Sequence, residues 1–242
     1  MQPKVVIDAR MVTKDPHGIG KYTFDLVEGL SHLLSPKDKS PYRLIVLTAQ
    51  ENNNIFLKYE VEEVKVNTPF LSSFELFTIP KILKKLNADL YHSPSFSSLL
   101  YCPCPWMVTV HDLNHLSYGN FPKKTYYQLL LKQFIRRAEK VLTVSKFSQK
   151  EIADWSKVPF NDIEVAYNAI TMEEKEDECE EELIKKVGLE KNRFFFSLSS
   201  SKSHKNIKFL IQAYIEYKGK MTSDKPLPLV LNLTRKELQS LG

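Results

Sequence analysis

The feature that most constrains the fold of this chain is a regular alternation of short apolar runs with longer runs of helical periodicity. Seven runs have the length and residue types of strands, and they read KVVIDA, YRLIVL, EVKVNT, DLYH, WMVTV, KVLTV and IEVA. Between them lie runs with helical apolar spacing: Ile19 to Leu34, FELFTIPKILKKL, Thr125 to Ala138 and KFSQKEIADW. Strands separated by helices imply parallel βαβ units. The sequence therefore predicts an α/β domain.

Two residues are expected to shape these helices locally. Pro80 is expected to disturb the helix FELFTIPKILKKL, because proline cannot donate the backbone hydrogen bond of a helix interior. Ser145 directly precedes KFSQKEIADW and is expected to be its N-cap.

An acidic run marks a change in the organisation of the chain. Residues 171–192 contain nine acidic and four basic residues, a net charge of −5, which leaves +10 for the remainder. After this run the pattern restarts with FFFSLS, NIKFLIQAYIEY and PLVLNL. We expect a first domain over 1–170, a linker with a short helix over 171–192, and an incomplete second domain over 193–242, since about 50 residues are too few for a full doubly wound domain.

Composition and charge exclude several classes of protein. The N-terminus has no apolar signal-peptide core, and no run approaches the roughly 18 apolar residues of a membrane span. The odd number of cysteines (Cys102, Cys104 and Cys179) indicates reduced cytoplasmic thiols, and the pair in CPC is too small for a structural zinc site, so no metal site is expected. The basic body suits phosphate-bearing ligands or an anionic membrane surface, whereas no nucleic-acid motif is present.

Polar and titratable residues follow the predicted strands. Ligands of open parallel sheets bind beyond the carboxyl ends of the strands, so the sequence predicts a cleft at that edge. Its candidate lining residues are Asp8, Arg10, His17, Gly18, Gly20, His92, His111, Asp112, Ser145 and Asn168.

The glycine pair at the start of the helix that ends at Leu34 has two readings. Glycine destabilises a helix by about 1 kcal/mol relative to alanine, so the presence of Gly18 and Gly20 at a helix start requires an explanation. Either they let an anionic ligand approach the helix N-terminus closely, or the turn requires a positive φ. The dinucleotide fingerprint G-x-G-x-x-G does not fit, because Gly18 lies well past Ile7 and Thr23 occupies the third glycine position. This departure argues against an NAD-dependent oxidoreductase.

Two further motifs each have a functional and a structural reading. His111 in VTVHDL either donates a hydrogen bond or a proton near neutral pH, or it forms a structural pair with Asp112 at a strand end. Residues 199–203 with Lys205 precede a predicted helix and suit a pyrophosphate, or they form a solvated basic turn. In isolation, the structural reading is favoured for both motifs.

Taken together and in order, these motifs resemble those of the retaining, nucleotide-sugar-dependent glycosyltransferases of family 4. The resemblance spans nearly the whole chain and rests on IDAR with GIGKYTFDL, then ADLYHSP, VTVHDL, YYQLLLKQFIRRAEKVLTVSKFSQKEI, IEVAYNAI and HKNIKFLIQAY. It implies the GT-B fold of two facing Rossmann-like domains, the first complete and the second only begun. Among subgroups, the chain looks most like mannosyl- or rhamnosyl-type transferases of surface polysaccharide assembly.

The resemblance also implies roles for single residues. Gly18 and Gly20 match a loop near the donor phosphates and the reaction centre. His111 matches a histidine thought to touch the transferred sugar, which makes it the catalytic candidate. Lys205 matches a lysine that grips the donor pyrophosphate, and Ser200 stands where the family often has an arginine.

One departure from the family pattern concerns the donor domain. Its paired-glutamate motif, E-x7-E, is not found after Lys205, where the glutamates are Glu216 and Glu237. Its absence favours an isolated chain that is inactive or non-catalytic, whereas the intact GIG, HD and HKN favour a glycosyltransferase lineage.

The resemblance implies transfer of a sugar from a nucleotide-sugar donor to an acceptor hydroxyl with retained configuration, in polysaccharide or glycoconjugate assembly. The acceptor would be a saccharide or a lipid-linked saccharide, with no metal and no cofactor required and no nucleic-acid partner. The expected location is the cytoplasm. The basic helix FELFTIPKILKKL either contacts the inner face of the membrane peripherally or packs on the sheet as an ordinary amphipathic helix, and the packed reading is favoured. The alternatives are a non-catalytic binding module and one subunit of a split enzyme completed by a second chain.

Overall fold

The protein is described by a computed structural model. It describes residues 2–14, 16, 18–34, 40–51, 55–114, 116, 121–169, 178–198, 205–221 and 225–239. The chain divides into two compact units, Met1–Ile170 and Thr171–Gly242. Each unit is described by itself.

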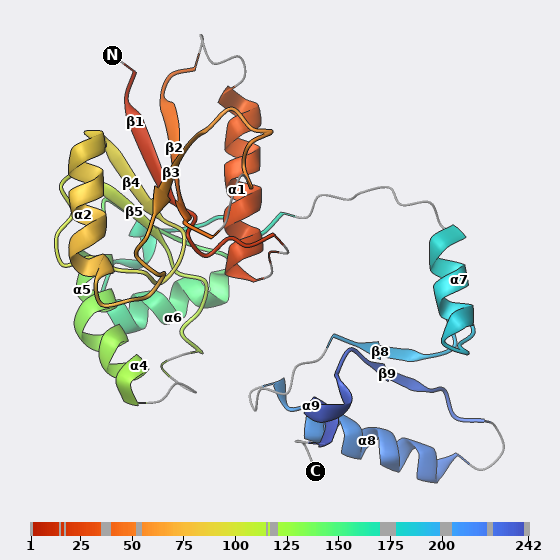
Figure 1. Ribbon diagram of the computed structural model, residues 1–242. Helices are drawn as coiled ribbons and strands as arrows, with labels where there is room; N and C mark the ends of the chain where they lie inside the picture. The colour runs from red at the N-terminus through yellow and green to blue at the C-terminus, as the bar shows by residue number, and fades with distance from the viewer. Residues whose placement is uncertain are drawn as a thin grey trace. The chain divides into compact units, whose positions relative to one another are not determined.

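The first unit is built on a seven-stranded sheet whose neighbouring strands all pair in parallel, in the order β3-β2-β1-β4-β5-β6-β7 (Figure 1). The strands are β1 (Lys4–Asp8), β2 (Arg43–Ala49), β3 (Glu62–Val66), β4 (Leu90–Ser93), β5 (Trp106–Thr109), β6 (Lys140–Thr143) and β7 (Ile163–Val165). All seven predicted strands are present, and the predicted α/β class is confirmed.

Helices follow β1, β3, β5 and β6. They are α1 (Ile19–Leu34), α2 (Glu75–Leu86), α4 (Phe121–Tyr126), the π-helical turn η2 (Tyr127–Leu131), α5 (Lys132–Arg136), α6 (Lys146–Ser156) and the 3-10 turn η3 (Phe160–Asp162). The helix predicted from Thr125 thus begins at Phe121 and contains a π turn. Pro80 lies inside α2, which continues through it because Ile79 and Leu83 are buried against the sheet.

Strand β1 shows why the apolar runs are nearly continuous. Val6 belongs to one core cluster, with Ile79 and Leu83 of α2, whereas Ile7 belongs to another, with Val27 of α1. Successive strand residues point to opposite faces, so helices bury both faces of the sheet. Figure 1 shows α1 and α2 on opposite sides of the strands. Burying each such aliphatic side chain contributes about 1.5–3 kcal/mol.

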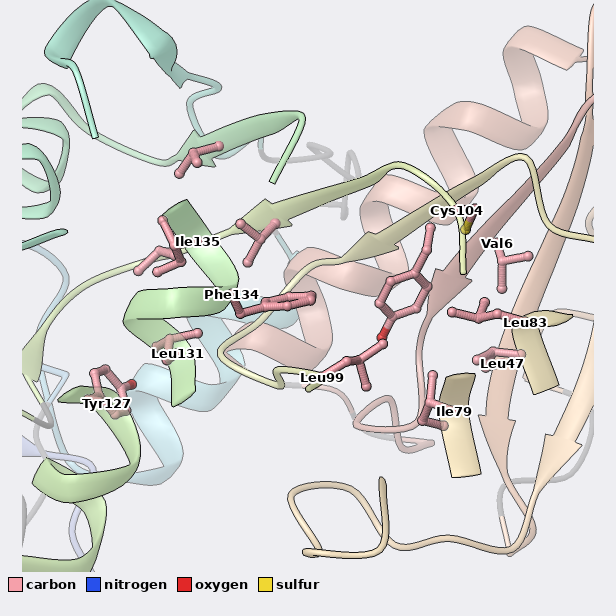
Figure 2. Packing of buried hydrophobic residues seen from close by; sticks show 14 of the residues in the cluster. Val6, Leu47, Ile79, Leu83, Leu99, Cys104, Tyr127, Leu131, Phe134 and Ile135 are labelled. Atoms are coloured by element: carbon pink, nitrogen blue, oxygen red, sulfur yellow. The ribbon is translucent and has the colours of Figure 1, made fainter. Parts of the chain in front are cut away.

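The larger cluster extends along the sheet under η2 and α5. Figure 2 shows Leu131, Phe134 and Ile135 projecting from this helical segment into the core. Trp106 of β5 stacks on Phe134, with ring centroids 5.2 Å apart. This packing fixes the end of the helical segment against the start of β5.

The second unit contains a small parallel sheet and three helices within its described residues. Its elements are α7 (Glu178–Lys186), β8 (Phe195–Ser197), α8 (Ile207–Lys220), β9 (Leu229–Leu231) and α9 (Arg235–Gln239). Helix α9 was not predicted, although Thr234 and Glu237 form a capping box there: the Glu237 N–H donates to Thr234 Oγ1 and the Thr234 N–H to Glu237 Oε2. In the part of the chain that the structure describes, no helix is both long and apolar enough to cross a membrane.

Candidate functional site

The two glycines at the start of α1 each have a local structural reason. Gly18 has a φ of +58°, a left-handed conformation in which a Cβ is strained. A Cβ on Gly20 would lie 3.1 Å from the carbonyl oxygen of Met11, so glycine lets the helix lie close to the preceding segment. The turn reading therefore has a physical basis, and a phosphate role for these residues stays a prediction. His17 lies outside the described residues.

The ring of His111, just beyond β5, is held from two sides. Its Nε2 lies 3.0 Å from the carbonyl oxygen of Pro94, and Tyr22 of α1 meets it edge to face with centroids 4.6 Å apart. Because a carbonyl oxygen only accepts, Nε2 carries the hydrogen and Nδ1 is the acceptor of the neutral ring. Burial lowers the pKa of His111, against the opposing effects of the Pro94 carbonyl and the Asp112 charge, so the neutral ring is favoured.

His92 is linked to Tyr22 through the hydroxyl group of Thr109. His92 Nε2 is 2.9 Å from Thr109 Oγ1, which lies 3.3 Å from the Tyr22 hydroxyl. Burial, with a smaller effect of His111, lowers the pKa of His92 to about 4, so this side chain is neutral at pH 7. His92 and His111 are thus brought together by Tyr22 and Thr109.

Asp8 and Arg10 belong to a separate, buried network. Arg10 Nη2 lies 2.7 Å from Asp8 Oδ2 and 2.9 Å from Glu75 Oε2, and all three side chains are almost inaccessible. Arg10 also donates to the carbonyl oxygen of Thr68. Burial raises the pKa of Glu75, and the Asp8 charge adds to this effect while Arg10 opposes it. The network ties the end of β1 to the start of α2 and leaves Asp8 and Arg10 no open surface.

Asp112 is exposed and is engaged with its own loop. Its Oδ1 accepts from the backbone N–H of Asn114 at 3.0 Å, and its Oδ2 accepts from the Asn114 side-chain amide at 2.8 Å. The charge of Asp112 opposes the effect of burial on the pKa of His111, while its hydrogen bonds shape the turn.

Ser145 caps α6, as predicted. Its Oγ accepts from the backbone N–H of Ser148 at 3.1 Å, and Ser148 Oγ donates to the carbonyl oxygen of His111 at 2.9 Å. The start of α6 is thereby fastened to the backbone of the candidate catalytic histidine.

A pocket of about 360 Å³ lies between the first two turns of α1 and the segment that follows β7. Gly18 and Tyr22 line it from the helix, together with Asp25, which pairs with Lys21. Tyr167 and Asn168 line it from the other side, and both are exposed. Of the predicted rim residues, Gly18 and Asn168 therefore meet at one pocket.

Two predicted donor residues lie in the second unit. Lys205 is exposed and stands two residues before α8, and Asn206 between them adopts a left-handed conformation with φ 50°. Ser200 lies outside the described residues. Within those residues, no group of three or more His, Cys, Asp or Glu side chains could hold a metal ion together.

Sequence reasoning missed Tyr22, Thr109 and Tyr167 as members of the site. Tyr22 carried a usable signal, since it falls one turn into the helix that starts at the carboxyl edge. Pro94 contributes only a backbone carbonyl, for which the side-chain sequence holds no signal.

Among the comparisons with known proteins, the match to a family model identifies the family. The family model described as Glycosyltransferase Family 4 matches residues 16–174. A comparison with curated proteins found no match. Among solved structures, the quinone oxidoreductase from Coxiella burnetii aligns at 11% identity over 96% of this chain and 53% of that chain, so this chain spans about half its length. The TM-score of 0.25 does not indicate a shared fold.

Proposed function

This chain belongs to Glycosyltransferase Family 4, and we propose that it transfers a sugar from a nucleotide-sugar donor to an acceptor hydroxyl with retained configuration. The observation that carries the proposal is the family match over residues 16–174, which includes Tyr22, His111 and Asn168. The parallel sheet with polar groups at its carboxyl edge supports it. Polysaccharide or glycoconjugate assembly is the proposed setting.

His111 is proposed to contact the transferred sugar. The Pro94 carbonyl holds the hydrogen of the ring on Nε2, so Nδ1 is the nitrogen that can accept a hydrogen bond from a sugar hydroxyl. The lowered pKa keeps that lone pair available at neutral pH. Tyr22 keeps the ring in place through its edge-to-face contact.

Lys205 is proposed to stabilise the departing diphosphate. As the bond to the diphosphate breaks, negative charge develops on the leaving oxygens, and fixed cationic groups lower the barrier. Lys205 is exposed and stands two residues before α8, whose first turn presents backbone N–H groups.

The pocket between α1 and the segment after β7 is proposed to receive a saccharide. Its volume of about 360 Å³ lies within the range of small-ligand pockets. The rings of Tyr22 and Tyr167 supply apolar surface with polar ends, and Asp25 and Asn168 supply acceptors and donors for hydroxyl groups.

Calorimetric titration with UDP, GDP and their hexose conjugates, followed by an assay for release of the nucleoside diphosphate, tests the transfer proposal. We expect one nucleotide to bind, and Lys205→Ala to weaken it about tenfold or more. Lys220→Ala, at the far end of α8, is the matched control and should bind normally. His111→Ala should slow nucleotide release about 10–100-fold while leaving nucleotide binding intact. Anomeric analysis of the product by NMR tests retention.

Nucleotide binding without release of the nucleoside diphosphate would favour the non-catalytic binding module. Absence of both binding and release would show that this chain does not contain a donor site by itself.

Saturation-transfer NMR with methyl glycosides of mannose, rhamnose and glucose tests the pocket separately. Tyr167→Ala should abolish the signal, whereas Tyr101→Ala, an exposed tyrosine elsewhere, should keep it. A signal unchanged by Tyr167→Ala would place the saccharide outside this pocket.

A further inference from the structure

We propose that Cys102 and Cys104 form a redox-active dithiol that closes to an intrachain disulfide by exchange with a low-molecular-weight disulfide. The sequence marks the pair as CPC, and nothing in sugar transfer uses it. The proposal stands apart from the proposed function and is tested without any activity assay.

The geometry places the two sulfurs within reach of each other. Both thiols are free, and their Sγ atoms lie 4.0 Å apart in the segment between β4 and β5. Two residues of chain span at most about 7 Å, and the backbone bends at Pro103 and Cys104. The Cα atoms are therefore at most about 7 Å apart, next to the upper end of the range of about 4.4–6.8 Å in which disulfides occur. Closing the bond needs the sulfurs to approach by about 2 Å, which side-chain rotation can supply.

The two thiols have different environments, which assigns them different roles. Cys102 is half-buried, whereas Cys104 is buried in the core cluster drawn in Figure 2. The hydrogen bond from Cys104 lowers the pKa of Cys102, and the same contact together with burial raises the pKa of Cys104. The thiolate is the nucleophile in exchange, so Cys102 is the attacking sulfur and Cys104 the resolving one.

The reaction proceeds in two balanced steps. The Cys102 thiolate attacks one sulfur of oxidised glutathione, so that a mixed disulfide forms at Cys102 and one glutathione thiolate leaves. Cys104 then loses its proton to solvent and attacks the Cys102 sulfur, which releases the second glutathione thiolate. The protein has lost two hydrogens to form one S–S bond, and the oxidised glutathione has been reduced to two thiols.

The disulfide so formed is expected to be reversible. Stabilisation by a disulfide grows with the number of residues in the closed loop, and this loop contains one residue between the cysteines. Disulfides with little stabilisation or with strain are the labile ones, which reduced glutathione reopens.

The test uses the full chain carrying Cys179→Ser, so that Cys102 and Cys104 are the remaining cysteines. The protein is equilibrated in glutathione buffers of increasing oxidised fraction, quenched in acid, alkylated and mapped by mass spectrometry. We expect a Cys102–Cys104 disulfide that rises with the oxidised fraction and disappears on return to reduced glutathione.

Variants separate the two steps. Cys104→Ser should accumulate the glutathione adduct on Cys102, whereas Cys102→Ser should form neither adduct nor disulfide at comparable rates. Cys104→Ala repeats the first test with an apolar side chain, in case a buried serine hydroxyl perturbs folding, and circular dichroism checks the fold of each variant. A stable adduct on Cys102 in the protein that retains both cysteines, or no modification of either cysteine, would overturn the proposal.

Discussion

Burial controls the charge of the histidines around the candidate site. The pKa of His92 is lowered to about 4, whereas histidine in an unfolded chain titrates near 6.5. Below pH 6.5 His92 therefore becomes protonated in the unfolded chain, whereas in the folded chain it stays neutral down to about pH 4. The stability that the neutral ring contributes is complete above pH 6.5 and is lost as the pH falls toward 4.

We accordingly expect the free energy of unfolding to fall by about 2 kcal/mol from His92 alone between pH 7 and pH 5. Urea titrations at both pH values measure this change. His92→Gln removes the titrating group, so the variant should lose less stability over the same interval. Equal losses in the variant and the wild type would show that His92 titrates normally in the folded protein.

Arg10 compensates two buried carboxylates. Removing it leaves Asp8 and Glu75 buried next to one another, and breaking a buried ion pair in this way costs about 3–5 kcal/mol. Arg10→Ala should lower the free energy of unfolding by this amount in urea titrations. Arg43→Ala, which breaks an exposed pair with Glu62, is the matched control and should cost about 1 kcal/mol or less. A similar cost for both would argue against the buried network.

At the scale of the element, two glycines of helix α1 differ in whether the structure has room for a Cβ atom. Gly29 lies on its exposed side, where a Cβ would have no neighbour within 4 Å, whereas a Cβ on Gly20 would lie 3.1 Å from a backbone oxygen. Gly29→Ala should raise the free energy of unfolding by about 0.5–1 kcal/mol, because alanine is the better helix former. Gly20→Ala should give no such gain. Thermal unfolding of the two variants measures the difference. Equal gains in stability would mean that the segment at Met11 moves away from an added Cβ at no cost.

The loop over 93–98 connects α4 to the candidate histidine. Tyr126 accepts from the backbone N–H of Ser98 at 3.0 Å and donates to the carbonyl oxygen of Phe96 at 2.9 Å. The same loop carries the Pro94 carbonyl that holds His111. Its position is therefore set by the helix as well as by the sheet.

Tyr126→Phe should destabilise the protein by about 1–3 kcal/mol and move the ring signals of His111 in a two-dimensional NMR spectrum. The exposed Tyr101 provides the control, since Tyr101→Phe should change neither quantity. If the Tyr126→Phe variant is destabilised but its His111 signals do not move, the loop does not control the position of the histidine.

At the scale of the whole molecule, the two units differ in how much apolar surface they bury. The first unit has one core cluster along all seven strands and a second one at β1 and β2. The described part of the second unit has two strands of three residues, and Phe196 and Leu198 are 57% and 80% exposed. Short strands with little burial open readily.

We therefore expect β8, α8 and β9 to exchange amide hydrogens much faster than β1 to β6 in a dilute solution of the chain. Hydrogen exchange read by mass spectrometry tests this expectation. Uniformly slow exchange over both units would mean that the second unit is stabilised by more than its own packing.

Most of the first unit could be predicted because its signals are local. Strands buried on both faces are near-continuous apolar runs, as in RLIVLTA of β2, and the helices between them keep their apolar spacing. Ser145 could be recognised as a cap because a cap and its partner lie within one turn. The π turn of η2 and the short helix α9 were not predicted, since each depends on a few residues whose pattern also fits an ordinary helix or a turn.

By itself, the sequence determined the order of strands and helices and the family to which this chain belongs, because periodicity and short motifs are local properties of the chain. The tertiary structure decided which polar residues meet. Arg10 pairs with Glu75, 65 positions away, and Tyr22 approaches Thr109, 87 positions away. Such partners are set by the order of strands in the sheet and by the packing of α1 on it, so Arg10 became a buried structural cation while Tyr22 joined the candidate site.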